Sequence, residues 1–128
     1  VLIGGGEGRF REEIKALYMN VTKQSPIILT DNITAEAIKL AMNVWFSTKV
    51  VFCNQLFDWA QKSGVNYERI KECLERHPFG MKNHMTIYYK GKRGVRGGCL
   101  PKDLEAFANY TQLPLLLKVK EINDNIEQ

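Results

Sequence analysis

A cysteine that follows two glycines, Cys99, is the residue of this sequence best placed to do covalent chemistry. Pro101 is favoured in the first turn of a helix, so Cys99 is expected just before a helix N-terminus. A helix N-terminus and a nearby cation, here Lys102, both favour the thiolate form of a cysteine, which is the reactive nucleophile. Asp103, in the same turn, is placed to hydrogen-bond a reacting group or water beside the sulfur. The pattern favours a reactive cysteine over an inert one.

The segment before Cys99 combines glycine with positive charge. Seven of the 18 lysines and arginines lie between Arg76 and Lys102, a stretch without Asp or Glu, so the other residues carry more acids than cations. Glycines let backbone amides approach a ligand closely, and cations attract phosphate. A phosphate-bearing partner is expected, whether nucleic acid, nucleotide or lipid headgroup. A solvated basic surface loop is the alternative.

Two further polar residues, Lys39 and Asn43, are four positions apart, so they project from one face of a predicted helix. The residues around them are largely apolar. A lysine and an asparagine on a mostly buried helix require partners, which makes this face a candidate wall of an active site. Taken alone, a helical lysine is more often solvated and an asparagine often only packs.

That helix is the longest predicted element. It begins at a cap provided by Asn32 or Thr34 and stops at Gly64, and at ~1.5 Å per residue it spans roughly 45 Å. Its apolar residues cover most of its circumference, so several neighbours must bury it. A second copy of the chain or another domain is the expected cover, with Trp45, Phe52 and Trp59 as anchors.

The chain before the long helix is predicted as strand, helix, strand, over Val1–Ile3, Phe10–Val21 and Pro26–Leu29. The segment Gly4-Gly5-Gly6-Glu7-Gly8 resembles the turn of a dinucleotide-binding unit. It does not match G-x-G-x-x-G, however, because Arg9 or Arg11 occupies the third glycine position. No GK[ST] follows either, so a structural turn is favoured.

Beyond the long helix, a shorter helix is predicted from a cap at Asn66 to a stop before Pro78. The stretch 79–98 has no regular period and is predicted as a long loop, which in a compact domain is typically functional or disordered. Two final helices are expected from Pro101 and from near Pro114.

The other potential ligands and nucleophiles give weaker signals. Cys53 and Cys73 fall in helical patterns and are expected to be buried and inert, and no cysteine spacing indicates a disulfide framework or a zinc site. His77 and His84 have no ligand partner at a suitable spacing, so neither is assigned a function and no metal is predicted. No apolar run approaches the roughly 20 residues that span a bilayer, so a soluble, cytoplasmic protein without membrane contact is expected.

Three segments carry a resemblance to a known family. The stretch 97–103, Gly-Gly-Cys-Leu-Pro-Lys-Asp, resembles the G-G-[ST]-C-x-x-K-D signature of the UDP-glucose/GDP-mannose dehydrogenases, nucleotide-sugar 6-dehydrogenases. The stretch 34–43 resembles their A-E-x-x-K-x-x-x-N helix start, and 63–66 with the helix after it fits the next element. Gly98 departs from the usual Ser or Thr, and Lys92, Arg93 and Arg96 make the loop more basic than usual.

The resemblance implies a mainly α fold, with a long central helix in a helical central domain that a short β-α-β remnant of a Rossmann-like domain precedes. Residues 1–32 would be the tail of the NAD-binding domain and 33–128 the central dimerisation and substrate domain. It implies a homodimer through the central helix, a nucleotide-sugar substrate and two NAD per turnover, with NAD bound mainly by residues outside this chain. The chain alone is therefore expected to be inactive.

The resemblance also implies roles for individual residues. Cys99 would be the nucleophile, while Lys39, Asn43 and Asp103 would hold the C6 oxygen and position water. The residues implied in substrate binding are Tyr88, Tyr89, Lys90, Gly94, Arg96, Gly97, Gly98 and Lys102. The choice between UDP-glucose, a UDP-N-acetylhexosamine and GDP-mannose stays open.

Two alternatives also stay open. The first is a nucleic-acid-binding module in which Tyr88 and Tyr89 stack on bases of a strand that the basic loop attracts. It leaves the pattern from Cys99 to Asp103 unexplained, so nucleic acid is disfavoured. The second is a domain whose whole function is dimerisation through the long helix.

Overall fold

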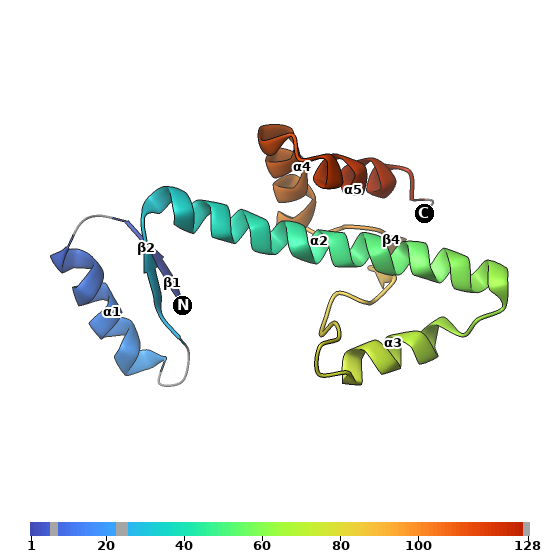
Figure 1. The fold of residues 1–128 in the computed structure, drawn as a ribbon, viewed down its shortest axis with the longest axis horizontal. Helices are drawn as coiled ribbons and strands as arrows, with labels where there is room; N and C mark the ends of the chain where they lie inside the picture. The colour runs from blue at the N-terminus through green and yellow to red at the C-terminus, as the bar shows by residue number, and fades with distance from the viewer. Residues whose placement is uncertain (6–7, 23–25, 127–128) are drawn as a thin grey trace. The chain divides into compact units, whose positions relative to one another are not determined.

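The computed structural model describes residues 1–5, 8–22 and 26–126 of the 128-residue chain, and it is mainly helical (Figure 1). Its elements are β1 (Leu2–Gly4), α1 (Arg9–Val21), β2 (Ile28–Thr30), α2 (Asn32–Ser63), α3 (Tyr67–Arg76), β3 (Tyr88–Tyr89), β4 (Lys92–Arg93), α4 (Cys99–Thr111) and α5 (Pro114–Asp124). The chain divides into two compact units, Val1–Ala41 and Met42–Gln128. The predicted mainly α fold with a short β-α-β start is confirmed.

The first unit contains a parallel pair of strands joined through α1. Leu2 pairs with Ile28 and Gly4 with Thr30. A Cβ on Gly4 would collide with the Cβ of Ala35 at the start of α2, so this glycine serves close packing of the strand against the helix. Gly6 and Glu7 of the predicted glycine turn lie outside the described residues.

The N-terminus of α2 is capped by Asp31, whose Oδ1 accepts a hydrogen bond from the Thr34 N–H at 2.8 Å. Hydrogen bonds from the Thr34 side chain and backbone lower the pKa of Asp31 to about 2. The predicted caps, Asn32 and Thr34, were wrong, since both lie within the helix. The helix stops as predicted before Gly64, which has a φ of 70°.

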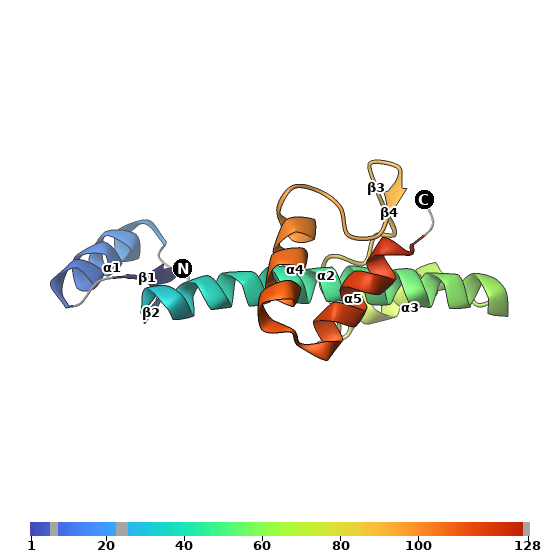
Figure 2. The ribbon, with the colours of Figure 1, turned by 90° about the horizontal axis from the view of Figure 1, so that it is seen from above.

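In the second unit, α4 and α5 lie on one side of α2 and α3 lies on the other (Figures 1 and 2), and buried hydrophobic side chains form a cluster on each side. On one side α4 and α5 close a cluster that consists of Val44, Val50, Val51, Val95, Leu104, Ala108, Leu116 and Val119. On the other side α3 and the following loop close a second cluster that consists of Cys53, Ala60, Tyr67, Met85 and Ile87. Because both clusters share α2, this helix fixes the loop 77–98 and the start of α4 in one framework.

Three local predictions were wrong. The predicted irregular loop holds a hairpin, in which Tyr88 pairs with Arg93 and Tyr89 with Lys92. Its tip has positive φ angles, 51° at Lys90 and 76° at Gly91, which suit the right-handed twist of a tight hairpin. The fourth helix begins at Cys99 itself rather than at Pro101. Cys73, expected to be buried, is exposed on α3, because it lies away from the face that packs on α2.

No helix in the described ranges is long and apolar enough to cross a membrane. Nor do three or more His, Cys, Asp or Glu side chains gather there to hold a metal ion.

Candidate active site

Cys99 is the first residue of α4 and is exposed. Gly97, with a φ of 95°, gives the loop the left-handed turn that leads into the helix. On α2, the buried Ser47 hydroxyl donates to the carbonyl oxygen of Asn43 at 2.9 Å and lies 3.5 Å from that of Leu100. The cysteine therefore sits at the solvent-facing N-terminus of a helix that packs on α2.

A buried carboxylate lies one turn further along α4. Asp103 is 2% exposed, and its Oδ2 accepts from Asn43 Nδ2 of α2 at 2.6 Å. Its Oδ1 accepts from Lys102 Nζ at 2.7 Å. This hydrogen bond raises the pKa of Lys102, with the charge of Asp103 as the second cause and that of Cys99 as a smaller one. Residues distant in sequence thus form one polar cluster at the start of α4.

A cavity of about 420 Å³ opens beside Cys99. The residues that line it are Val50, His84, Thr86, Tyr88, Tyr89, Gly94, Arg96, Gly97, Gly98, Cys99 and Leu100. Most of the residues predicted to bind substrate are among them, and within this described lining there is no Asp or Glu. A cavity with a cation and without acids favours an anionic ligand.

The loop that forms this cavity is anchored on both sides. Asn123 of α5 is buried, and its Oδ1 accepts from the Val95 N–H at 2.6 Å. A Cβ on Gly94, whose φ is 79°, would lie 2.8 Å from that oxygen. On β4, Arg93 pairs with Asp58 at 2.6 Å and donates to Asn54 Oδ1 at 3.1 Å. Sequence reasoning missed these anchors, because no local pattern links α5 or the middle of α2 to the loop.

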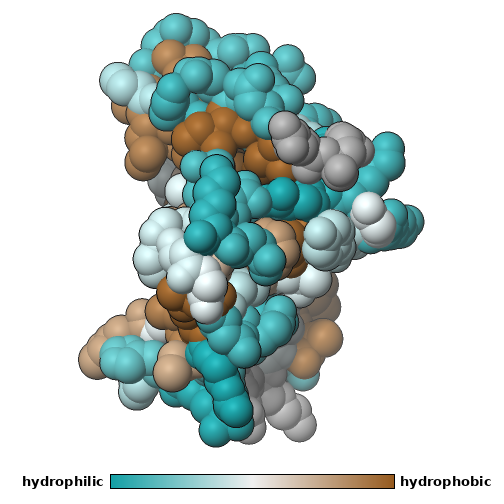
Figure 3. Space-filling view, turned by 90° about the vertical axis from the view of Figure 1, so that its right-hand side faces the viewer, coloured by the Kyte–Doolittle hydropathy of each residue, from teal (hydrophilic) through white to brown (hydrophobic). Residues whose placement is uncertain are grey.

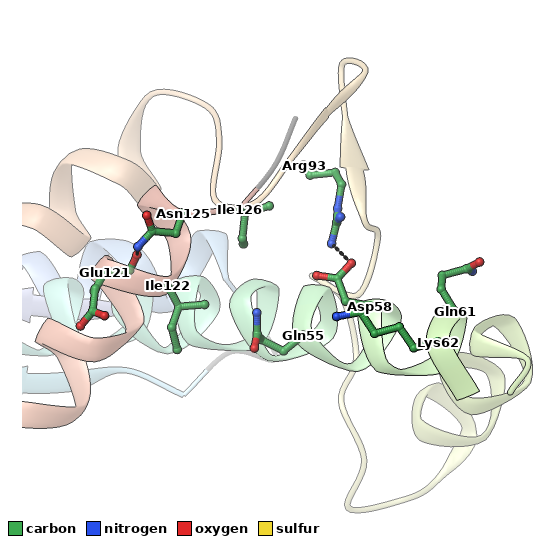
Figure 4. A pocket seen from close by; sticks show the side chains of 9 residues that line it. All are labelled: Gln55, Asp58, Gln61, Lys62, Arg93, Glu121, Ile122, Asn125 and Ile126. Carbon is green, nitrogen blue, oxygen red and sulfur yellow. Dashed lines mark hydrogen bonds and ion pairs between the residues drawn. The ribbon is translucent and has the colours of Figure 1, made fainter. Parts of the chain in front are cut away.

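A second cavity, of about 480 Å³, lies between α2, β4 and α5 (Figure 4). Its lining consists of Gln55, Asp58, Gln61, Lys62, Arg93, Glu121, Ile122, Asn125 and Ile126. Arg93 and Asp58 face each other there and are joined by their ion pair (Figure 4). Acids, cations and amides are mixed in this lining and it has no cysteine, so its chemistry does not single out a reaction.

The remaining candidate residues fall outside the Cys99 cavity. Lys90 lies at the hairpin tip, with Nζ 5.6 Å from the centre of the Tyr89 ring. Lys39 belongs to the first compact unit, on α2 one helical turn before Asn43. By contrast, His84 lies in the cavity wall. No function was predicted for it, because it is distant in sequence from Cys99 and no spacing links the two.

Comparison with known proteins identifies the family of the domain that contains this site. The model of the central domain of the UDP-glucose/GDP-mannose dehydrogenase family matches residues 33–125. The chain belongs to this family. It is similar to UDP-glucose 6-dehydrogenase of Rhizobium meliloti (strain 1021), with 29% identity over 96% of this chain and 29% of that protein. It is also similar to GDP-mannose 6-dehydrogenase of Azotobacter vinelandii, with 34% identity over 70% of this chain and 20% of that protein.

A solved structure extends the family likeness to three dimensions. The UDP-glucose dehydrogenase of the hyperthermophilic archaeon Pyrobaculum islandicum superposes with a TM-score of 0.69 and 25% identity, over 94% of this chain and 28% of that one. The chain spans less than a third of the length of these dehydrogenases. The predicted resemblance to the UDP-glucose/GDP-mannose dehydrogenase family is thereby confirmed.

Proposed function

We propose that this chain is the middle part of a nucleotide-sugar 6-dehydrogenase, which oxidises the C6 hydroxyl of a UDP- or GDP-sugar to a carboxylate. In this proposal residues 1–32 are the tail of the NAD-binding domain and 33–128 the central domain. The observation that carries it is the position of Cys99, at a helix N-terminus, on an acid-free cavity and close to the buried Asp103 cluster.

The sulfur of Cys99 would carry the sugar between two oxidations. The Cys99 thiolate attacks the C6 aldehyde, a C–S bond forms, and the aldehyde oxygen takes up a proton to give a thiohemiacetal. Loss of a hydride from C6 and of the hydroxyl proton converts this to a thioester, and water then releases the carboxylate and frees the thiol. From alcohol to carboxylate the sugar loses four electrons, which the nicotinamide cofactor accepts as hydride, in two NAD per turnover.

The polar cluster beside Cys99 would stabilise the charge that develops on the C6 oxygen. The hydrogen bonds from Asn43 and Lys102 hold the Asp103 carboxylate in one position, on rigid helices. Asp103 would position the attacking water, while Asn43 and Lys39 would hold the C6 oxygen. Such preorganised donors and acceptors need no rearrangement during the reaction.

Gly4 and Gly5, at the end of β1, do not fit the phosphates of NAD. Gly4 serves packing against Ala35, and a Cβ on Gly5 would approach the side chain of Asn32, so neither leaves the open cradle that a pyrophosphate needs. NAD would therefore be bound mainly by residues outside this chain. The residues described here supply the cysteine and the wall that faces the sugar.

The proposal includes a homodimer through α2. Residues at heptad spacing form a stripe along this helix, made of Met42, Trp45, Lys49, Phe52, Leu56 and Trp59. Trp45 is 57% exposed, and Phe52 and Trp59 are each 52% exposed. An apolar cavity of about 270 Å³ lies among Trp45, Phe52 and Met81, where a side chain of a second copy would insert. On the face that Figure 3 shows, patches of hydrophobic residues interrupt a mostly hydrophilic surface.

The proposal is tested with the full-length protein that contains this chain, assayed for uronic acid production from UDP-glucose, a UDP-N-acetylhexosamine and GDP-mannose. One of these substrates is expected to be oxidised with NAD. The Cys99→Ser variant should bind this substrate but lose steady-state turnover, because a hydroxyl does not readily form and release the acyl intermediate. Cys73→Ser, a change at another exposed cysteine, is the matched control and should keep normal turnover. Near-normal turnover of Cys99→Ser would refute the mechanism.

A further inference from the structure

His84 is one of the residues that line the cavity beside Cys99. Its ring stacks on that of Phe46 from α2, with the ring centres 4.3 Å apart and the planes inclined by 10°. Its Nδ1 is buried and has no hydrogen-bond partner within the described part of the chain. Because Nδ1 has almost no accessible surface, a ligand in the cavity would meet the ring through its other nitrogen, Nε2.

The backbone around His84 is held in a conformation that side chains rarely adopt. Asn83 has a φ of 66° and His84 a φ of 63°, two consecutive non-glycine residues in the left-handed region. On one side of them, Lys49 Nζ donates to the Lys82 carbonyl at 3.3 Å. On the other, the Tyr67 hydroxyl donates to the Met85 carbonyl at 2.8 Å. Strain that the surroundings enforce in this way is typical of binding sites.

We propose that His84 is a substrate-binding residue, whose imidazole edge hydrogen-bonds a hydroxyl of the hexose whose C6 reacts at Cys99. The inference rests on the proposed function, since it takes the Cys99 cavity as the sugar site. The ring of His84 would orient the sugar, and stacking on Phe46 fixes the plane of the imidazole.

The charge state of the ring selects a hydroxyl over a phosphate. Burial lowers the pKa of His84, and the charge of Lys49 lowers it further. A neutral imidazole has one donor and one acceptor, which complements a hydroxyl, since a hydroxyl also donates and accepts. Arg96 in the same lining, whose Nε also lacks a partner among the described residues, is the group suited to phosphate oxygens.

The test compares His84→Asn with His77→Asn in the full-length enzyme. Asparagine tolerates a positive φ, so the change removes the ring without adding backbone strain. His77 is exposed and lies outside the cavity lining, which makes it the matched control. For His84→Asn, KM for the nucleotide sugar should rise about 3- to 10-fold, the effect of one lost neutral hydrogen bond. Inhibition by the nucleoside diphosphate, UDP or GDP, should stay as in the wild type.

Any other result of this comparison contradicts the inference. An equal weakening of nucleotide sugar and nucleoside diphosphate would place His84 on phosphate, and unchanged KM would remove it from the site. If wild-type enzyme oxidises no nucleotide sugar, the proposed function itself fails. Phe46→Leu keeps the histidine but removes its stack, so it should raise KM in the same direction and provides the test if His84→Asn does not fold.

A binding measurement on the full-length protein gives an independent result. The imidazole NMR signal of His84 is the one that disappears in the His84→Asn variant. UDP-glucose or GDP-mannose should shift the His84 signal, whereas UDP or GDP should leave it in place. A nucleotide sugar that binds and leaves the His84 signal unmoved would overturn the inference.

Discussion

At the scale of single residues, the three cysteines lie in three environments. Cys53 is fully buried, and burial raises the pKa of its thiol, whereas Cys73 and Cys99 are exposed. We expect a thiol reagent such as Ellman's to modify two thiols of the native chain rapidly and Cys53 only after unfolding. In the Cys73→Ser variant only the Cys99 thiol should still be modified rapidly, and a bound nucleotide sugar should slow this modification. Rapid modification of Cys53 would contradict the packing described.

Asp103 is predicted to stabilise the fold as well as the site. Asp103→Ala removes the acceptor of the Asn43 amide in a part-buried position, and an unsatisfied polar group of this kind costs about 1–3 kcal/mol of unfolding free energy. Urea unfolding at neutral pH measures this loss. Asp124→Ala, which removes an exposed ion pair with Lys120, is the control and should change stability little. Equal midpoints for the two variants would contradict the role given to Asp103.

At the scale of elements, the capping of α2 makes its N-terminus sensitive to acid. The pKa of Asp31 is lowered to about 2 in the folded chain by the hydrogen bonds of Thr34, from 3.8 in an unfolded one. Its stabilisation is therefore present above pH 3.8 and is lost as the pH falls through about 2. Asp31→Asn keeps a side-chain acceptor for the cap but not the charge. Circular dichroism between pH 5 and pH 2 should show a smaller acid-induced helix loss in Asp31→Asn; equal losses would argue against the cap.

The sequence predicted those elements whose signals are local. Helical spacing and the Asn66 cap predicted α1 and α3, and Gly64 predicted the end of α2, because each depends on neighbouring residues. The hairpin β3–β4 was missed, since two-residue strands carry no alternation to detect. The cap of α2 was misplaced by one residue (Asn32) or three (Thr34), because Asp31, Asn32 and Thr34 all have side chains suited to a cap.

The residues of the candidate site likewise fall into those that a local sequence pattern predicted and those that it did not. Cys99, Lys102 and Asp103 were found through their spacing in one turn, and Asn43 through its spacing from Lys39. Asn123 and His84 were missed, because their roles depend on tertiary contacts with Val95 and Phe46 that no local pattern encodes.

At the scale of the whole molecule, the exposed aromatic side chains of the α2 stripe, Trp45, Phe52 and Trp59, predict association with a second copy. Phe52→Glu places a charge in its centre, beside the apolar cavity, and should shift a dimer to monomer in sedimentation at tens of micromolar. Leu115→Glu, the same kind of change at an exposed residue of α5, is the control and should remain dimeric. A well-folded wild-type monomer at this concentration would contradict the predicted interface.

The central claim, that Cys99 carries the sugar between two oxidations, is tested most directly by the NADH yield of a single turnover. Full-length protein in excess over its nucleotide sugar is mixed with NAD, and the NADH formed per sugar is counted. The account predicts two NADH per sugar and a uronic acid product for the wild type, and for Cys99→Ser no turnover or a slow first oxidation that stalls. A yield of one NADH with release of the aldehyde, or an unchanged yield and rate in Cys99→Ser, would contradict it.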